Sequence, residues 1–295
     1  TSTQMEVFHQ LINGLALGSI YALLALGYTM VYGIIKLINF AHGEIYMVGA
    51  FVGYYVTNQF KLSLIPTLII SMAICACLGV LIEFLAYRPL RKSTRIAALI
   101  TAIGVSFLIQ SLMIYFIGAD TRPFPQIVDN TNYDLGIFVI SKIQLMILST
   151  SIILMILLQV IVKYTKMGKA MRAVSVDADA AQLMGINVNH TISFTFAIGS
   201  ALAAAGGVLI GLYYNSIDPM MGVAPGLKAF IAAVFGGIGI IPGAALGGFA
   251  IGIIETFVSA LGFTAYRDAV VYAILIIVLL VRPAGLLGKN VKEKV

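Results

Sequence analysis

The chain has 295 residues, of which 60% are hydrophobic and only 10% are charged, and its mean hydropathy is +1.02. A soluble domain carries about 25% charged residues, so this chain cannot build a water-facing surface and must use lipid as its main solvent. The formal net charge of +6 is explained by basic cytoplasmic loops, which the positive-inside rule requires, and nucleic-acid binding is not expected.

Apolar runs predict where the chain crosses the membrane. They lie near residues 8–35, 43–60, 64–87, 96–117, 143–162, 191–213, 226–241, 243–261 and 268–287. A membrane helix needs about 20 apolar residues, so the chain has room for about eight to ten membrane segments. The run 226–241 is short and rich in glycine, which predicts a half-helix or a re-entrant segment. The sequence therefore predicts an all-α polytopic membrane protein, in which residues 1–295 form one transmembrane domain with broken or re-entrant helices.

The loops between these runs predict the orientation of the chain. Basic residues gather in residues 88–95, in residues 163–190 and in the tail 289–294, which places these segments in the cytoplasm. One crossing on each side separates the loop 118–142 from a basic loop, so this loop is expected to be extracytoplasmic. Residues 214–226 are expected to face outward too, and the same alternation favours an N-terminus outside.

A polar break interrupts the first apolar region in the stretch "KLINFAHGEIYMVGAF". Asn39, His42, Gly43 and Glu44 lie together there, and ionisable groups inside a membrane are costly enough to be functional candidates. His42 and Glu44 do not form a metal pair on a helix, because residues i and i+2 do not face each other. No metal is therefore expected. Two interpretations stay open: a polar knot that bonds unwound backbone between half-helices, or the lining of a transport pathway.

A second break lies in the stretch "GGIGIIPGAALGGFAIGIIE", which holds Gly236, Gly237, Pro242 and Glu255. It weakly echoes the first break, since both place a polar or Gly/Pro-rich interruption beside a small-residue helix and an acidic residue. Interrupted hydrophobic segments in corresponding positions predict a transport site, so these four residues are candidates for the substrate pathway. Glu255 is deep enough in its apolar run to need a partner.

Three further ionisable residues suggest structural roles. Glu83 is close to Arg88 in the sequence and is expected to pair with it near the membrane interface. Lys228 follows an outward segment and is expected to extend its ammonium group to the interface.

The sequence carries no signature of an energy-converting or catalytic site. The P-loop pattern G-x-x-x-x-G-K-[ST] is absent, and "GGIGIIPG" is embedded in an apolar run, where a helix break explains it better. The patterns H-E-x-x-H, G-x-S-x-G and C-x-x-C are absent too. The chain is therefore not expected to be an enzyme, and any ATP that drives transport would be hydrolysed by another chain.

The basic segment 163–190 is the most informative polar stretch. The sequence "DADAAQLMGI" within it predicts a short helix on the cytoplasmic face, with Gly185 as its C-cap and with Leu183, Met184 and Ile186 in apolar contacts. Such a helix can dock in a groove of a partner protein. An ordinary loop between two membrane helices is the alternative.

Four stretches carry a resemblance to a known family. They are "GSIYALLALGYTMVYGIIKLINFAHGEIYMVGA" (18–50), "MGKAMRAVSVDADAAQLMGIN" (167–187), "GLKAFIAAVFGGIGIIPGAALGG" (226–248) and "RPAGLLG" (282–288). Together, in this order and over nearly the whole chain, they resemble the branched-chain amino acid ABC transporter permeases of the LivH type.

The resemblance implies a multi-pass transmembrane permease subunit in the cytoplasmic (inner) membrane of a bacterium. Such a subunit pairs with a second, LivM-like permease and with two ATPase subunits that hydrolyse ATP, so the chain itself binds no cofactor. An extracytoplasmic substrate-binding protein delivers leucine, isoleucine or valine as the small-molecule substrate. Related permeases of urea or short amides share the "NFAHGE" element, so a urea, short-amide or other amino-acid substrate is the alternative. An ion-driven secondary transporter, with Glu44 and Glu255 as ion ligands, is a less favoured interpretation.

The resemblance also makes residues 163–190 the coupling loop to the ATPase. The positions that stand in the matched motif are Gly168, Arg172, Ala173, Ala181 and Gly185.

Overall fold

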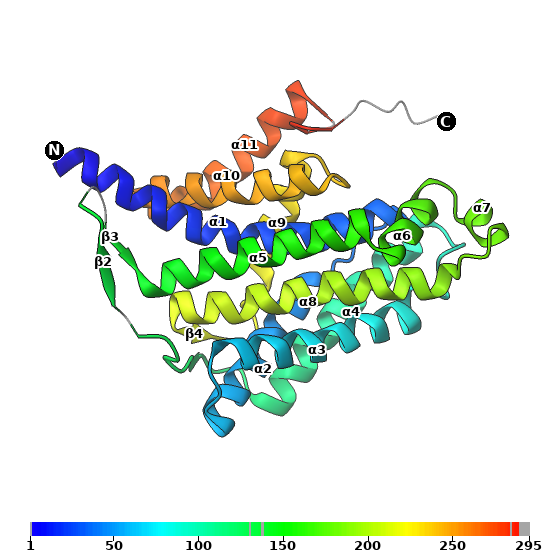
Figure 1. Cartoon of the computed structure of the whole chain (residues 1–295), viewed down its shortest axis with the longest axis horizontal. Coiled ribbons are helices and arrows are strands. Elements are labelled where there is room, and N and C mark those ends of the chain that lie inside the picture. The colour runs from blue at the N-terminus through cyan, green and yellow to red at the C-terminus, as the bar shows by residue number, and fades with distance from the viewer. Residues whose placement is uncertain (1, 130, 137–138, 284, 289–295) are drawn as a thin grey trace.

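The computed structural model describes residues 2–129, 131–136, 139–283 and 285–288. The elements in these residues, in chain order, are α1 (Ser2–Ile35), α2 (His42–Phe60), α3 (Leu64–Ile82) with its π-helical end η1 (Glu83–Tyr87), α4 (Arg95–Ile117), β1 (Arg122–Pro123), β2 (Asn132–Asp134), β3 (Val139–Ser141), α5 (Lys142–Tyr164), α6 (Lys166–Val176), α7 (Ala178–Leu183), α8 (Val188–Tyr214), β4 (Ser216–Ile217), α9 (Val223–Gly236), α10 (Ile241–Ala260), η2 (Thr264–Tyr266) and α11 (Arg267–Val281). Figure 1 shows that the long helices lie roughly side by side as one bundle. The basic tail 289–294 lies outside the described residues.

Seven of the described helices are long and apolar enough to cross a membrane. They are α1, α3 with η1, α4, α5, α8, α10, and α11 with η2. Helix α9 has 14 residues and is about 21 Å long, which is shorter than the hydrocarbon core of about 30 Å. The predicted all-α polytopic fold is confirmed, and so is the short helix expected within 226–241.

Helices α1 and α8 form the centre of the bundle, and α10 lies directly against α1 (Figure 1). Small residues allow this contact: a Cβ on Gly252 would clash with the Cα of Gly18, and a Cβ on Gly18 would lie 2.8 Å from the Cα of Phe249. Membrane helices gain stability from such close backbone packing. Moving an apolar side chain from lipid to the protein interior gives little free energy, because both surroundings are apolar. The glycine content thus determines how the centre packs.

The outer helices expose their apolar side chains. Phe116 on α4 and Leu280 on α11 are examples, with 76% and 79% of their surface exposed. In water such a surface would be an aggregation hazard, whereas in a bilayer it faces lipid or another membrane helix. The described structure therefore matches a multi-pass membrane protein.

Short β-strands pair the loop segments at one end of the bundle with each other. β1 pairs with β4 in antiparallel register, so that Arg122 lies opposite Ile217, and this joins the loop 118–142 to the segment after α8. β2 and β3 pair with each other within the same loop. Asn13 near the start of α1 bonds Gln144 at the start of α5, so the N-terminal end of α1 lies at this end as well (Figure 1).

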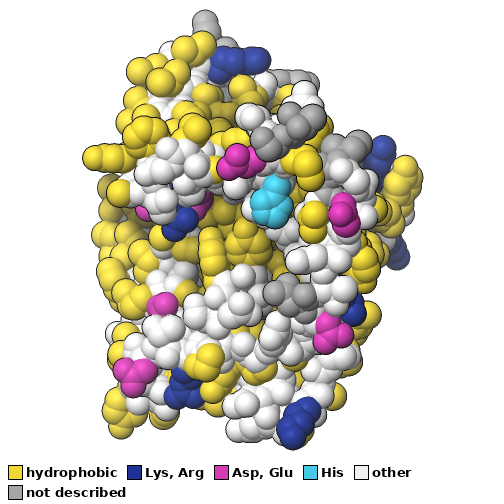
Figure 2. All heavy atoms as spheres, turned by 90° about the vertical axis from the view of Figure 1, so that its left-hand side faces the viewer, with side chains coloured by type: hydrophobic (Ala, Val, Ile, Leu, Met, Phe, Trp, Pro, Cys, Tyr) yellow, Lys and Arg dark blue, Asp and Glu magenta, His cyan; other side chains and the backbone are white. Residues whose placement is uncertain are grey.

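Figure 2 views the end that carries the strands and the start of α1. Charged side chains are scattered over this face, whereas hydrophobic side chains gather along its edges and inside a hollow. The two segments predicted to face outward thus share one end of the molecule. Basic loops lie at the other end, where Arg91 donates a hydrogen bond of 2.6 Å to the side chain of Asn189.

The segment 163–190 folds into two helices, whereas the sequence analysis expected one short helix. Helix α6 adds eleven residues before α7. Leu183 and Met184 are 88% and 83% exposed, so the bundle does not supply the apolar contacts expected for them. Only Ile186 is partly buried against the bundle. A helix of six residues has one side toward the bundle, and here that side carries Ala181.

Candidate functional site

The starts of α2 and α9 meet inside the bundle. Gly43 on α2 packs against the backbone of Gly222 and Gly226 at the start of α9, and a Cβ on Gly43 or Gly222 would clash with the other chain segment. His42, the first residue of α2, contacts Leu24 of α1, which lies eleven residues before α1 ends at residue 35. After α1 the chain therefore folds back about 16 Å before α2 begins.

Asn39 holds the extended segment that makes this turn. Its side-chain oxygen accepts hydrogen bonds from the backbone N–H of Ala41 at 3.1 Å and from the hydroxyl of Tyr87 at 3.2 Å. Backbone groups that leave a helix inside a membrane must find partners within the protein. Asn39 is 1% exposed and therefore acts as a structural link between the break and η1.

His42 also bonds backbone. Its Nε2 lies 3.0 Å from the carbonyl oxygen of Leu24, and its ring lies 4.5 Å from the ring of Tyr28. Gly27 leaves space for the imidazole, since a Cβ there would clash with the ring. The polar-knot interpretation thus describes Asn39, whereas His42 bonds a carbonyl oxygen within the continuous helix α1.

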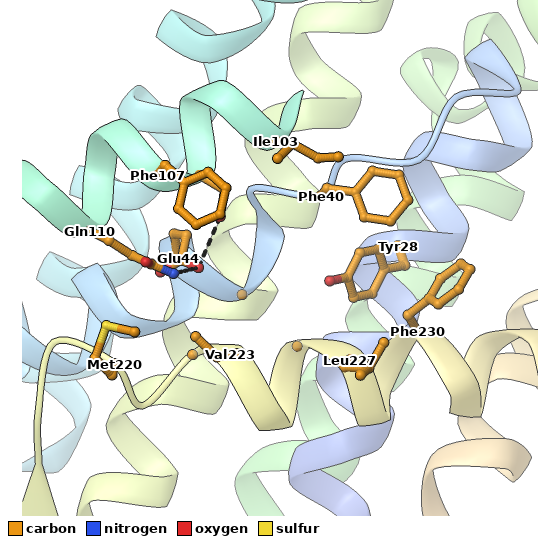
Figure 3. A pocket seen from close by; sticks show the side chains of 14 residues that line it. Tyr28, Phe40, Glu44, Ile103, Phe107, Gln110, Met220, Val223, Leu227 and Phe230 are labelled. Carbon is orange, nitrogen blue, oxygen red and sulfur yellow. Dashed lines mark hydrogen bonds between the residues drawn. The ribbon is translucent and has the colours of Figure 1, made fainter. Parts of the chain in front are cut away.

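A cavity of about 370 Å³ lies where the two helix starts meet (Figure 3). Its lining residues are Tyr28, Phe40, Gly43, Glu44, Ile103, Ser106, Phe107, Gln110, Met220, Gly222, Val223, Gly226, Leu227 and Phe230. They come from α1, the 36–41 break, α2, α4 and α9 with the segment before it. The volume is at the lower end of the range of about 300–1,000 Å³ that small-molecule sites occupy.

Glu44 is the charged side chain that lines this cavity. Its Oε1 accepts hydrogen bonds from Ser106 at 3.0 Å and from Gln110 at 2.7 Å, both on α4. Its Oε2 is buried and has no hydrogen-bond partner among the residues that the structure describes. The hydrogen bonds of Glu44 therefore go to side chains and not to unwound backbone, so the polar-knot interpretation does not describe this residue. One of its two oxygens has no hydrogen-bond donor among the described residues.

Tyr28 supplies a second polar group. Its hydroxyl points into the cavity, and its ring packs edge-on against Phe230 at 6.0 Å (Figure 3). Phe40 lies 6.1 Å from Phe230 and closes the same side of the cavity. Ile103 and Phe107 cover the side toward α4. Polar groups are few and the walls are apolar, as in sites that bind small molecules.

The second predicted break does not line this cavity. Gly236 and Gly237 end α9, Pro242 lies in the first turn of α10, and Gly237 has a φ of 108° that glycine adopts without strain. The backbone N–H groups of Leu286 and Leu287 bond the carbonyl oxygens of Phe235 and Gly236 at this turn. The structure thus joins this turn to the "RPAGLLG" stretch, away from the start of α9.

Glu255 has the partner that its depth requires. Its Oε1 lies 3.1 Å from Nζ of Lys228, and its Oε2 accepts a hydrogen bond of 3.0 Å from the hydroxyl of Tyr21. Lys228 also lies 2.7 Å from Asp268. The expectation that Lys228 reaches the interface is wrong, because it is 4% exposed and pairs inside the protein.

Glu83 pairs as expected with Arg88, at 2.9 Å, and also with Arg91 at 2.6 Å. It is fully buried beside Ser193, which donates a hydrogen bond of 2.8 Å to it. This network joins η1 to α8 at the basic end of the bundle. Among the described residues, no group of three or more His, Cys, Asp or Glu side chains is placed to hold a metal ion.

The five candidate coupling residues lie together around α6 and α7. Gly168 allows α6 to approach the end of α5, where a Cβ would clash with the carbonyl oxygens of Ile161 and Val162. Arg172 donates a hydrogen bond of 3.3 Å to the carbonyl oxygen of Lys163, so α6 folds back on α5.

A Schellman motif ends α7. The N–H of Ile186 bonds the carbonyl oxygen of Ala181 at 3.1 Å, and Gly185 takes a φ of 89° between them. Ala173 in turn accepts the N–H of Asp177, whose side chain caps α7 through the N–H of Ala180. Ala173, Ala181 and Gly185 thus fix the turns on both sides of α7. Gly168 and Arg172 hold α6 against α5.

The sequence analysis missed Tyr28, Ser106, Gln110 and Phe230. Ser106 and Gln110 are four residues apart and therefore share one face of α4, a helix that is mostly apolar. That spacing is a signal that could have identified them. Tyr28 and Phe230 give no such signal, because aromatic side chains are common in membrane helices.

The fold and the site define a class: a multi-pass α-helical membrane protein with broken helices around a largely apolar cavity that holds a few polar groups. The chain belongs to the family described as "Branched-chain amino acid transport system / permease component", which matches residues 10–279. It is 42% identical to the "High-affinity branched-chain amino acid transport system permease protein LivH" of Escherichia coli (strain K12), over 97% of both chains.

Two other relatives agree with this membership. The chain is 41% identical to the "High-affinity branched-chain amino acid transport system permease protein BraD" of Pseudomonas aeruginosa, over 98% of this chain and 99% of that protein. It is 31% identical to the "Probable branched-chain amino acid transport permease protein LivH" of Methanocaldococcus jannaschii, over 93% and 90%. No solved structure matched the chain.

Proposed function

We propose that this chain is a transmembrane permease subunit of an ATP-binding-cassette importer that takes up leucine, isoleucine and valine. The observation that carries the proposal is the identity of 42% over 97% of the chain to a permease named for branched-chain amino acid transport. The cavity supports it, because walls of Phe, Ile and Leu suit an aliphatic side chain better than they suit urea. The membrane would be the cytoplasmic membrane of a bacterium.

The partners follow from the same proposal. A second, LivM-like permease completes the pathway, and two ATPase subunits bind and hydrolyse ATP, since this sequence has no P-loop pattern. An extracytoplasmic binding protein delivers the amino acid to the end that carries β1 and β4, where the loop 118–142 and residues 214–225 lie together.

We propose the other end as the ATPase contact. Helix α7 presents Leu183 and Met184 to the outside of the bundle, and two exposed apolar side chains on a short rigid helix suit insertion into a partner's groove. Because α7 is fixed through Gly185 and Asp177, a movement of the ATPase would be passed to α6 and α8 as a rigid-body shift.

The experiment is reconstitution of the complex. The chain is co-expressed with the products of adjacent permease, ATPase and binding-protein genes, purified, and placed in proteoliposomes. We expect ATP-dependent uptake of leucine, isoleucine and valine, and ATPase activity that rises with the loaded binding protein. Uptake by this chain alone in an ion gradient, or stimulation by urea but by no branched-chain amino acid, would contradict the proposal.

A further inference from the structure

The cavity at the starts of α2 and α9 contains an acceptor without a donor. Glu44 is 3% exposed, and Ser106 and Gln110 together satisfy only its Oε1. Oε2 is buried without a partner among the described residues. A buried carboxylate oxygen without a donor destabilises a protein, so its retention beside a cavity points to a ligand that donates to it.

The neighbouring groups limit what that ligand can be. A metal ion would need several carboxylate or imidazole ligands, and the described part of the chain places no such group here. A single carboxylate oxygen in an apolar pocket instead suits an ammonium group, which forms short charge-assisted hydrogen bonds.

The same cavity also offers a place for a negative charge. The start of α9 borders it through Gly222, Val223 and Gly226, and the N-terminal end of a helix carries a partial positive charge. The hydroxyl of Tyr28 points into the space between this helix start and Glu44 (Figure 3). One cavity therefore borders an acceptor for a cation and, on another wall, the hydroxyl of Tyr28 and the positive end of the α9 dipole, both of which suit an anion.

The remaining walls are apolar. Phe40, Ile103, Phe107, Leu227 and Phe230 surround the part of the cavity that these polar groups leave free. Apolar walls with few fixed polar groups orient a ligand that is polar at one end and aliphatic at the other.

We infer that this cavity binds the zwitterion of an aliphatic α-amino acid, with the carboxylate of Glu44 as acceptor for its ammonium group. The start of α9 and the hydroxyl of Tyr28 face the carboxylate, and the aromatic and aliphatic walls hold the side chain. The inference rests on the proposed function, to which it adds a defined binding site within this subunit and a residue that recognises the amino group.

The test compares leucine with 2-hydroxyisocaproate, which has the same carbon skeleton but no amino group. Binding of each labelled compound is measured by equilibrium dialysis on the assembled complex in nanodiscs, without the binding protein. The wild-type complex is expected to prefer leucine by about tenfold or more, because the leucine ammonium group forms an ion pair with the Glu44 carboxylate, whereas the hydroxyl group of the hydroxy acid carries no charge. The Glu44→Gln complex is expected to bind both compounds equally. An unchanged preference in Glu44→Gln would overturn the inference.

A second measurement does not depend on the Glu44 variant assembling. Ile103 lines the cavity and is 40% exposed, so an Ile103→Cys substitution in a Cys77→Ser background introduces a reactive thiol there. Leucine is expected to slow its modification by a methanethiosulfonate reagent at least fivefold, whereas 2-hydroxyisocaproate is not. Equal rates with and without leucine would overturn the inference.

The two proposals fail separately. If the wild-type complex imports leucine while neither binding nor protection responds to the amino group, the importer assignment stands and the site is wrong. If the wild-type complex imports no branched-chain amino acid, the proposed function itself fails.

Discussion

Lys228 on α9 and Glu255 on α10 form an ion pair of 3.1 Å in which the two side chains are only 5% and 1% exposed. The residue before Lys228, Leu227, lines the cavity. The pair therefore holds one face of α9 against α10 while the opposite face meets the cavity. A charge in this position is stabilised only as long as its partner remains.

We expect Lys228→Met to destabilise the protein by about 3 kcal/mol, because it leaves Glu255 buried with less compensation. The double variant Lys228→Met/Glu255→Met should recover most of the loss. Thermal unfolding of the purified complex, followed by size-exclusion chromatography, measures both. If the double variant is less stable than Lys228→Met, the loss of stability does not come from leaving Glu255 unpaired, and the expectation is wrong.

Close packing of α1 on α10 gives a second prediction. A Cβ on Gly252 clashes with the backbone of Gly18, so Gly252→Ala should force the helices apart and destabilise the protein by about 1–3 kcal/mol. Gly104→Ala on α4 is the matched control, since nothing lies within 4 Å of its Cβ position. The control should be neutral or slightly stabilising. Equal melting temperatures for the two variants would contradict the close contact.

The link through Asn39 gives a third prediction. Asn39→Ala leaves the N–H of Ala41 without its acceptor inside the membrane and should cost about 1–3 kcal/mol. We expect lower thermal stability and poorer assembly with the partner subunits, while the complexes that do assemble keep their preference for leucine over its hydroxy acid. Asn39→Asp retains the acceptor oxygen and serves as the control. A normally assembled Asn39→Ala complex that has lost this preference would show that Asn39 contacts the substrate.

The exposed side chains of α7 give a fourth prediction. A Leu183→Ser/Met184→Ser variant removes apolar surface without disturbing the core, because both side chains point away from the bundle. We expect the permease to keep its stability but to retain at least tenfold less ATPase subunit on co-purification. Phe60→Ser, at an exposed apolar position at the end of α2, is the control and should retain the ATPase. If the double variant retains the ATPase subunit fully, Leu183 and Met184 do not form the contact.

The positive φ of Gly185 gives a fifth prediction. Replacement by Ala in this conformation costs about 1 kcal/mol locally and weakens the end of α7. Gly262→Ala has the same backbone strain, with a φ of 88° and nothing within 4 Å, but lies in the turn after α10. We expect Gly185→Ala to lower uptake per ATP hydrolysed and Gly262→Ala to leave this ratio unchanged. The same ratio in both variants would indicate that α7 does not couple.

The sequence predicts the breaks in the fold well, because polar groups in an apolar run can be accommodated in few ways. Asn39 was expected to bond unwound backbone or to line a polar path, and it bonds backbone of the break, whereas His42 bonds a carbonyl oxygen of the continuous helix α1. The partner of Lys228 could not be predicted in this way. Whether a lysine reaches the interface or pairs inside depends on which helix packs beside it, and Glu255 is 27 residues away.

The composition of the cavity was predicted only in part. Glu44 was a candidate from its position alone, whereas Ser106 and Gln110 are 62 and 66 residues from it and become its partners only when α4 packs on α2. Leu183 and Met184 were expected in apolar contacts, and the sequence did not show that both side chains lie exposed on α7 rather than against the bundle. Which side of a short helix faces the bundle is decided by the caps at its ends, here by Asp177 and Gly185.

The contact of Gly43 with Gly222 has a consequence for how the starts of α2 and α9 can separate. The two helix starts touch through main-chain atoms, so no side chain lies between them that could rotate out of the way. Shortening neighbouring side chains therefore cannot part the two segments at this point. Only displacement of a whole helix start can.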